Sequence, residues 1–204
     1  MKIKICGLRE RENIEAVTAL QPDLMGFICY ERSPRFIADM QADVIANLSP
    51  DIQKTAVFVN ESANGIQTLI DKYGFDTIQL HGDESPEFAE SFRDQVTIIK
   101  AFGMDDLFDF DVLESYEGKV DYFLFDAKTA SYGGSGRTFN WDILNDYQLD
   151  VPFFLSGGLS LDNLEEVTKI THPQFYGVDL NSRFEIQPAL KDIEKLKRAF
   201  KLLK

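Results

Sequence analysis

A strand-then-helix pattern that recurs eight times is the feature of this chain that most constrains its fold. Each predicted strand is a short run of β-branched and aromatic residues, followed by a loop and by a stretch with helical spacing of apolar residues. The strands are predicted at residues 2–6, 24–30, 55–59, 77–80, 96–101, 122–125, 152–155 and 175–178. Each unit takes about 25 residues, enough for a strand and the helix that leads back to the next parallel strand.

The helices are predicted from apolar spacing and from signals at their ends. Ser85 is a suitable N-cap with Pro86 at the first helical position, Gly74 stands where a helix C-terminus favours glycine, and Asn140 offers an N-cap before Trp141. The predicted helices cover about residues 14–20, 39–48, 62–73, 85–93, 105–116, then run from 141, from 160 and from Pro188 to the end. The last carries one apolar stripe, formed by Leu190, Ile193, Leu196, Phe200 and Leu203.

Eight such units with nearly continuous apolar strands predict an α/β fold, a closed (β/α)8 barrel of the TIM type. An open doubly wound sheet is the alternative, but it normally uses fewer strands, and the eighth helix would have no strand to cover. No linker or break in composition divides residues 1–204, so we expect a single domain.

The charge and cysteine content exclude several classes of partner. The net charge is -13 and no basic block offsets it, which argues against nucleic acid or an anionic membrane as partner. Two cysteines are too few for a disulfide framework, and the alternating start MKIKICG and the lack of a long apolar run favour a cytoplasmic protein without a membrane span. No metal-ligand spacing appears, and the sequence leaves the oligomeric state open.

Polar and small residues follow most of the predicted strands, and in a parallel barrel these positions face one shared mouth where catalysis occurs. They are Cys6-Gly7, Arg32 to Arg35, Asn60, His81-Gly82, Asp126, Ser156-Gly157-Gly158 and Asp179 to Arg183. The mouth is therefore the predicted active site.

Cys6 and Asp126 are the candidates for acid–base chemistry. A cysteine in an apolar strand is usually a core residue, as we expect for Cys29, but Cys6 ends its strand and shares a face with Lys4. A nearby cation favours the thiolate, which a base or nucleophile requires. Asp126 ends its strand too and suits a general acid, although a turn or cap residue is an equal alternative. His81 is an acid or ligand candidate, or simply a structural histidine.

Two loops are candidates for binding a phosphate. In barrels the loops after strands seven and eight often offer backbone N–H groups to a phosphate, and here they hold Gly157-Gly158 and Asp179 to Arg183. The alternative is a pair of ordinary turns. The glycines at 133–136 fit neither a Walker loop nor a dinucleotide fingerprint.

Strand parity also predicts a buried ion pair. Lys4 lies one layer below Cys6, where an unpaired ammonium would be costly, and strand eight neighbours strand one in a closed barrel. We therefore expect Lys4 to pair with Asp179, which projects inward from strand eight.

The motifs, in their order along the chain, resemble the phosphoribosylanthranilate isomerase family of tryptophan biosynthesis. They are KICG at Lys4, GF at Gly26, SPRF at Ser33, VFVN at Val57, QLHG at Gln79, FDAKTASYGGSGRTFNW at Phe125 and LSGGL at Leu155. The family is a (β/α)8 barrel that performs an Amadori rearrangement on N-(5-phosphoribosyl)anthranilate without a cofactor.

The resemblance implies a role for individual residues. Cys6 corresponds to the general base, Asp126 to the general acid, and Arg35 to the arginine that holds the anthranilate carboxylate. His81 and Asp179 belong to the expected substrate-binding set, and the phosphate is expected on Gly157-Gly158 and Asn181-Ser182. Arg183 stands where many relatives have small residues. The alternatives are another sugar-phosphate isomerase or lyase, and a barrel that binds without catalysis.

Overall fold

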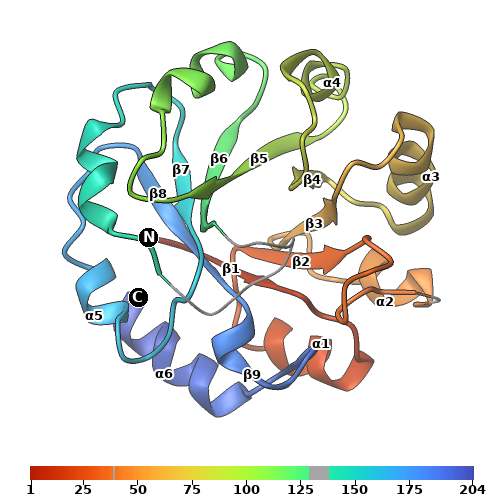
Figure 1. Ribbon diagram of the computed structural model, residues 1–204. Coiled ribbons are helices and arrows are strands. Elements are labelled where there is room, and N and C mark those ends of the chain that lie inside the picture. Colours follow the sequence, from red (N-terminus) through yellow and green to blue (C-terminus); the bar gives the residue numbers. More distant parts are fainter. Residues whose placement is uncertain (39, 129–137) are drawn as a thin grey trace.

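The eight predicted strands form a closed parallel barrel in the computed structural model, which describes residues 1–38, 40–128 and 138–204. The strands pair in chain order, β1 closes the barrel against β8, and helices surround them (Figure 1). The predicted fold is confirmed. The strands are β1 Lys2–Cys6, β2 Leu24–Ile28, β3 Gln53–Phe58, β4 Thr77–Leu80, β5 Thr97–Met104, β6 Tyr122–Ala127, β7 Phe153–Leu155 and β8 Phe175–Leu180.

Most helical segments are shorter than predicted, and three of those in the described residues are 3₁₀ helices. The α-helices are α1 Arg11–Thr18, α2 Ala42–Ala46, α3 Ala63–Tyr73, α4 Pro86–Glu90, α5 Leu164–Val167 and α6 Ile193–Leu203; the 3₁₀ helices are η1 Phe110–Tyr116, η2 Trp141–Asp146 and η3 Ser182–Phe184. The local end signals are confirmed. Ser85 and Asn140 each cap a helix by accepting a backbone N–H, and Gly74 ends α3 in the left-handed conformation.

The last unit differs from the prediction. The final helix begins at Ile193, capped by Asp192, and not at Pro188. A small hairpin precedes it, formed by β9 Glu185–Gln187 and β10 Leu190–Lys191. Leu190 therefore lies outside the helix, and its spacing from Ile193 imitated one more helical position. This hairpin is what brings Glu185 and Lys191 next to the barrel mouth.

Strand alternation divides the core in two. Outward residues such as Ile3 and Ile5 are fully buried against the helices in the larger cluster. A smaller cluster fills the barrel interior with Leu24, Ile99, Ala101, Leu124 and Phe154. Since these residues lie below the carboxyl ends of their strands, they form the floor under the mouth.

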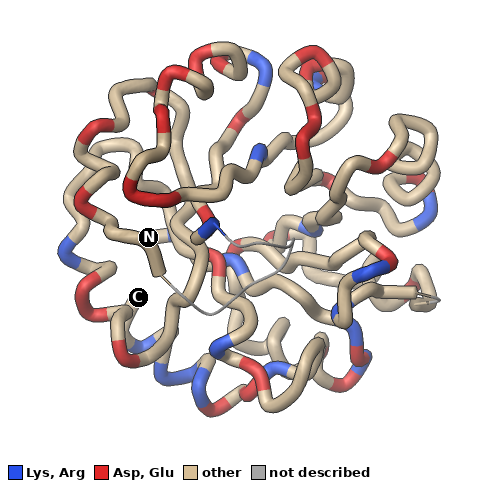
Figure 2. The backbone as a smooth tube through the Cα atoms, viewed as in Figure 1, with Lys and Arg blue, Asp and Glu red and all other residues tan. Residues whose placement is uncertain are grey.

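The surface agrees with the acidic composition. Asp and Glu residues lie along the outer helices and loops on all sides of the barrel (Figure 2). Among the described residues, no helix has the length and apolar character to cross a membrane.

Candidate active site

A pocket opens at the carboxyl ends of the strands and brings together most of the predicted site residues. It contains about 720 Å³ of unfilled space, including its open mouth. Its wall includes the predicted residues Cys6, His81, Asp126, Gly157, Gly158, Asp179, Asn181 and Ser182, together with apolar residues such as Ile28, Val57 and Leu159. A pocket with a polar set and an apolar wall suits a small-molecule ligand that has both polar and apolar parts.

Cys6 ends β1 and lies against Gly26 of β2. A Cβ atom at position 26 would lie 2.7 Å from the Cys6 sulfur, so only glycine leaves room for the thiol. Burial raises the pKa of the Cys6 thiol, and the Lys4 ammonium offsets only part of this effect. The expectation that a cation would make the thiolate the favoured form was therefore wrong for the ligand-free protein.

The predicted buried ion pair below the thiol is confirmed. Lys4 Nζ lies 2.9 Å from Asp179 Oδ2, and the two side chains are 0% and 5% exposed. Burial lowers the pKa of Lys4, but Asp179 and Cys6 together outweigh burial and raise it, so the ammonium stays charged. The second oxygen of Asp179, Oδ1, is buried without a hydrogen-bond partner among the described residues.

Asp126 and His81 lie next to each other in the pocket wall. Asp126 Oδ2, near the end of β6, lies 3.5 Å from His81 Nε2, just past β4. The other ring nitrogen of His81 lies 2.7 Å from the amide nitrogen of Gln79. Both His81 and Asp126 side chains are about one-fifth exposed, at 22% and 18%. They can therefore reach a bound ligand and each other.

The loops after β7 and β8 form another part of the pocket wall, with Gly157 beside Asp126. Gly157 has φ +83° and Gly158 has φ +67°, which L side chains rarely adopt, and a Cβ at Gly157 would lie 2.7 Å from Asp126 Oδ1. Among the described residues, neither glycine N–H donates a hydrogen bond. Ser182 begins the short helix η3 beside them. These features give an anion two free backbone donors next to the proposed acid.

Asn181 is held by the hairpin that follows it. Its side-chain oxygen accepts a hydrogen bond from Lys191 Nζ at 2.8 Å, and the same ammonium lies 2.7 Å from Glu185. Lys191 is 1% exposed. Burial lowers the pKa of Lys191 despite the attraction of Glu185.

Arg35 lies close to the site but is not part of the pocket wall. Its Nε and Nη2 donate to the Glu185 carboxylate at 2.6–3.1 Å, a bidentate ion pair in which the Arg35 side chain is 12% exposed. Nη1 donates no hydrogen bond within the described part of the chain. The guanidinium is thus already engaged on one edge, which the sequence did not predict.

Glu185, Lys191 and Gln79 were not recognised from the sequence. Lys191 and Glu185 fall where the final helix was expected or just before it, so their inward position could not be inferred. Gln79 gave a usable signal: strand parity places it on the same inward face as His81, two residues further on. No group of three metal-ligating side chains occurs in the described residues. The glycine loop at 133–136 lies outside the described residues.

Comparisons with known proteins agree along the whole chain. The family model for N-(5'phosphoribosyl)anthranilate (PRA) isomerase matches residues 3–202. The N-(5'-phosphoribosyl)anthranilate isomerase of Parabacteroides distasonis is 46% identical over 202 residues, covering 97% of this chain and 90% of that protein. The protein of the same name from Phocaeicola vulgatus is 42% identical, with 94% and 92% covered.

Solved structures show the same likeness. The phosphoribosyl anthranilate isomerase of Thermus thermophilus matches with a TM-score of 0.86 and 29% identity, over 99% of this chain and 98% of that one. The Thermotoga maritima structure gives 0.85 and 28%, with the same coverage. The resemblance inferred from the motifs is confirmed. The chain belongs to the N-(5'-phosphoribosyl)anthranilate isomerase family.

Proposed function

We propose that this chain isomerises N-(5-phosphoribosyl)anthranilate to 1-(2-carboxyphenylamino)-1-deoxyribulose 5-phosphate, as a step of tryptophan biosynthesis. The observation that carries the proposal is that Cys6 and Asp126 line one pocket together with two glycine N–H groups that have no acceptor among the described residues. Family membership supports the choice of substrate. The enzyme acts as one barrel domain, residues 1–204, on a phosphorylated anionic small molecule in the cytoplasm.

The reaction needs one acid and one base on the same sugar. Asp126 protonates the ring oxygen, the bond from that oxygen to C1 breaks, and the anthranilate nitrogen becomes an iminium. Cys6 then removes the proton from C2, and the electron pair neutralises the iminium to give an enolamine that tautomerises to the ketone. Since burial keeps the thiol protonated in the free protein, the iminium charge has to help release its proton.

The phosphate and the carboxylate of the proposed substrate bind to groups that still have a hydrogen-bond donor to offer. The phosphate lies on the N–H groups of Gly157 and Gly158, with Asn181 and Ser182 completing the loop on the other side. Arg35 offers its Nη1 edge to the anthranilate carboxylate, while Glu185 holds the other edge. His81 and Asp179 contribute to the wall between these two ends.

Two experiments test the proposal. Purified protein is mixed with freshly generated N-(5-phosphoribosyl)anthranilate, and its conversion is followed by the change in anthranilate fluorescence. The gene is also expressed in a tryptophan auxotroph that lacks this step. Turnover and growth without tryptophan are expected, and failure of both in a folded protein would refute the proposal.

Another sugar-phosphate isomerase or lyase on the same barrel would use the phosphate loops without requiring both Cys6 and Asp126. Full activity of Cys6→Ser on the anthranilate substrate would remove Cys6 from the mechanism. A barrel that only binds would hold the rearranged product tightly with no turnover by the wild type. Both outcomes can be read from the same assay.

A further inference from the structure

Gln79 is a buried polar residue of the pocket to which the reaction steps above give no task. It lies in β4 with 1% of its surface exposed, and its side chain reaches the pocket wall. Its Nε2 lies 2.7 Å from His81 Nδ1. Its Oε1 is buried with no hydrogen-bond partner among the described residues.

The short contact to His81 determines where the imidazole carries its proton. An amide NH₂ group is only a donor, so the ring nitrogen that it contacts, Nδ1, must be the acceptor and must lack a proton. Neutral His81 then carries its proton on Nε2, and that nitrogen lies 3.5 Å from the carboxylate of Asp126. The two contacts form one chain, from Gln79 through His81 to Asp126.

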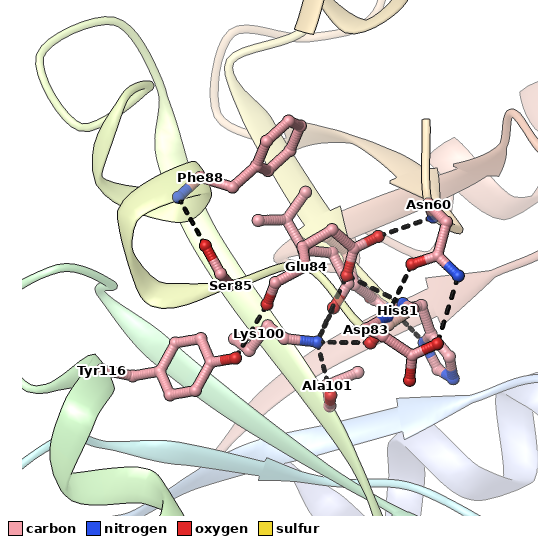
Figure 3. Close-up of polar contacts among 12 residues, drawn as sticks. Asn60, His81, Asp83, Glu84, Ser85, Phe88, Lys100, Ala101 and Tyr116 are labelled. Atoms are coloured by element: carbon pink, nitrogen blue, oxygen red, sulfur yellow. Dashed lines mark hydrogen bonds and ion pairs between the residues drawn. The ribbon is translucent and has the colours of Figure 1, made fainter. Parts of the chain in front are cut away.

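The backbone on both sides of His81 is held rigidly, so the side-chain contact is what remains to set the ring. The His81 N–H donates to Phe58 O at 2.8 Å. Next to it, Gly82 donates to Glu84 at 2.9 Å and accepts from Lys100 at 2.7 Å. Figure 3 shows this network, in which Lys100 and Glu84 form an ion pair with side chains 2% and 3% exposed.

The same network joins neighbouring strands. Glu84 Oε1 accepts the backbone N–H of Asn60, which follows β3, at 2.8 Å. Tyr116 of η1 donates its hydroxyl to the Glu84 carbonyl at 2.7 Å (Figure 3). The loop that carries His81 is thus tied to β3, β5 and η1. A loop held in this way can present its imidazole in one orientation once the ring is fixed at Nδ1.

We propose that Gln79 is a positioning residue that holds His81 as the Nε2-protonated tautomer, so that the Nε2 proton faces Asp126 at 3.5 Å and orients its carboxyl group toward the sugar. The consequence for catalysis rests on the proposed isomerase function, whereas the tautomer is a property of the protein alone. Gln79 acts on the rate through His81 and Asp126 and does not itself take part in the proton transfer.

The tautomer is measured directly by nuclear magnetic resonance. The chain has two histidines, so labelling with ¹⁵N-histidine gives two ring systems, and a His172→Gln variant identifies which is His81. At a pH where both rings are neutral, wild-type His81 is expected to show a proton on Nε2 and none on Nδ1. A protonated Nδ1 in the wild type would overturn the proposal, whether or not the protein turns over the substrate.

Two substitutions test the cause. Gln79→Glu places a group beside Nδ1 that can only accept, so His81 Nδ1 should become protonated and kcat should fall about 10-fold or more with little change in KM. Gln79→Leu removes the donor without adding a charge, and kcat should again fall about 10-fold at nearly constant KM. Unchanged kcat in Gln79→Leu, or an unprotonated Nδ1 in a folded Gln79→Glu, would contradict the assignment.

Thr55→Val is the matched control. Thr55 is also fully buried on a neighbouring strand, its hydroxyl oxygen has no partner among the described residues, and it makes no hydrogen bond to His81 there. The substitution keeps the shape and removes one polar atom, so neither the His81 tautomer nor kcat should change. If Thr55→Val altered both as Gln79→Leu does, the effect would come from general loosening of the barrel and the proposal would be wrong.

Discussion

Replacing Lys4 by Met should make the Cys6 thiol much harder to ionise. Lys4 and Lys191 are the cations that lower the pKa of Cys6, and Asp179 raises it. Lys4→Met removes one cation and leaves Asp179 without its partner at 2.9 Å. Both changes act in the same direction, toward a higher thiol pKa.

The size of the rise in the Cys6 pKa can be estimated from the lost Lys4 charge and from the dielectric constant around it. Two unit charges about 4 Å apart at an effective dielectric constant of about 20 interact by about 4 kcal/mol. One pKa unit corresponds to about 1.4 kcal/mol, so the loss of Lys4 can raise the thiol pKa by up to about 3 units. Because Lys191 remains near the thiol and still lowers its pKa, we expect a rise of about 2 units.

Alkylation by iodoacetamide reads the thiolate directly. The measurement is made in a Cys29→Ala background, since Cys29 is the other free cysteine, with a pKa that burial raises to about 12. At a pH below both thiol pKa values, a rise of about 2 units lowers the alkylation rate about 100-fold. Lys2→Met is the matched control, because Lys2 is in the same strand but pairs with Asp23 at an exposed site.

The stability of Lys4→Met and its alkylation rate in the folded state test the electrostatic role of Lys4. Lys4→Met should cost about 3–5 kcal/mol of unfolding free energy, because it leaves a buried carboxylate uncompensated, whereas the double variant Lys4→Met/Asp179→Asn should recover part of that loss. The electrostatic account is refuted if Lys4→Met is folded by circular dichroism and alkylates at the wild-type rate.

The remaining predictions concern the acid, the base and the carboxylate end. Cys6→Ala and Asp126→Asn should each lower kcat about 10²–10⁴-fold without unfolding the protein, and near wild-type turnover would exclude that residue from the mechanism. Arg35→Lys should raise the KM for the anthranilate substrate, since an ammonium cannot form a two-pronged contact; a large loss of inhibition by inorganic phosphate would instead make Arg35 a phosphate ligand. Glu185→Gln should lower the unfolding free energy by about 3–5 kcal/mol in denaturant titration, because the buried Lys191 and the partly buried Arg35 lose their partner, and an unchanged midpoint would contradict this.

The barrel strands were easier to predict from the sequence than the contacts between side chains at the barrel mouth. Strand alternation places Lys4 beneath Cys6 on the inward face of β1, and closure of the barrel places Asp179 of β8 beside it. This pair could therefore be predicted from the sequence. The pairing of Arg35 with Glu185 joins positions 150 residues apart. No local sequence pattern predicts a contact over that distance. The hairpin between β8 and the last helix was missed because Leu190 has the spacing from Ile193 that a helix would give it.

The buried charges at the mouth are better explained by function than by stability. Ion pairs such as Lys4–Asp179 are often no more stabilising than apolar side chains of the same size, because both charges lose their water. Around Glu185, one carboxylate is shared by two cations, Arg35 and Lys191. This group of three places two basic side chains against one carboxylate beside the pocket, in a protein whose overall charge is -13. An anionic substrate that the acidic protein as a whole repels would meet there a local excess of basic side chains, to which its carboxylate can bind.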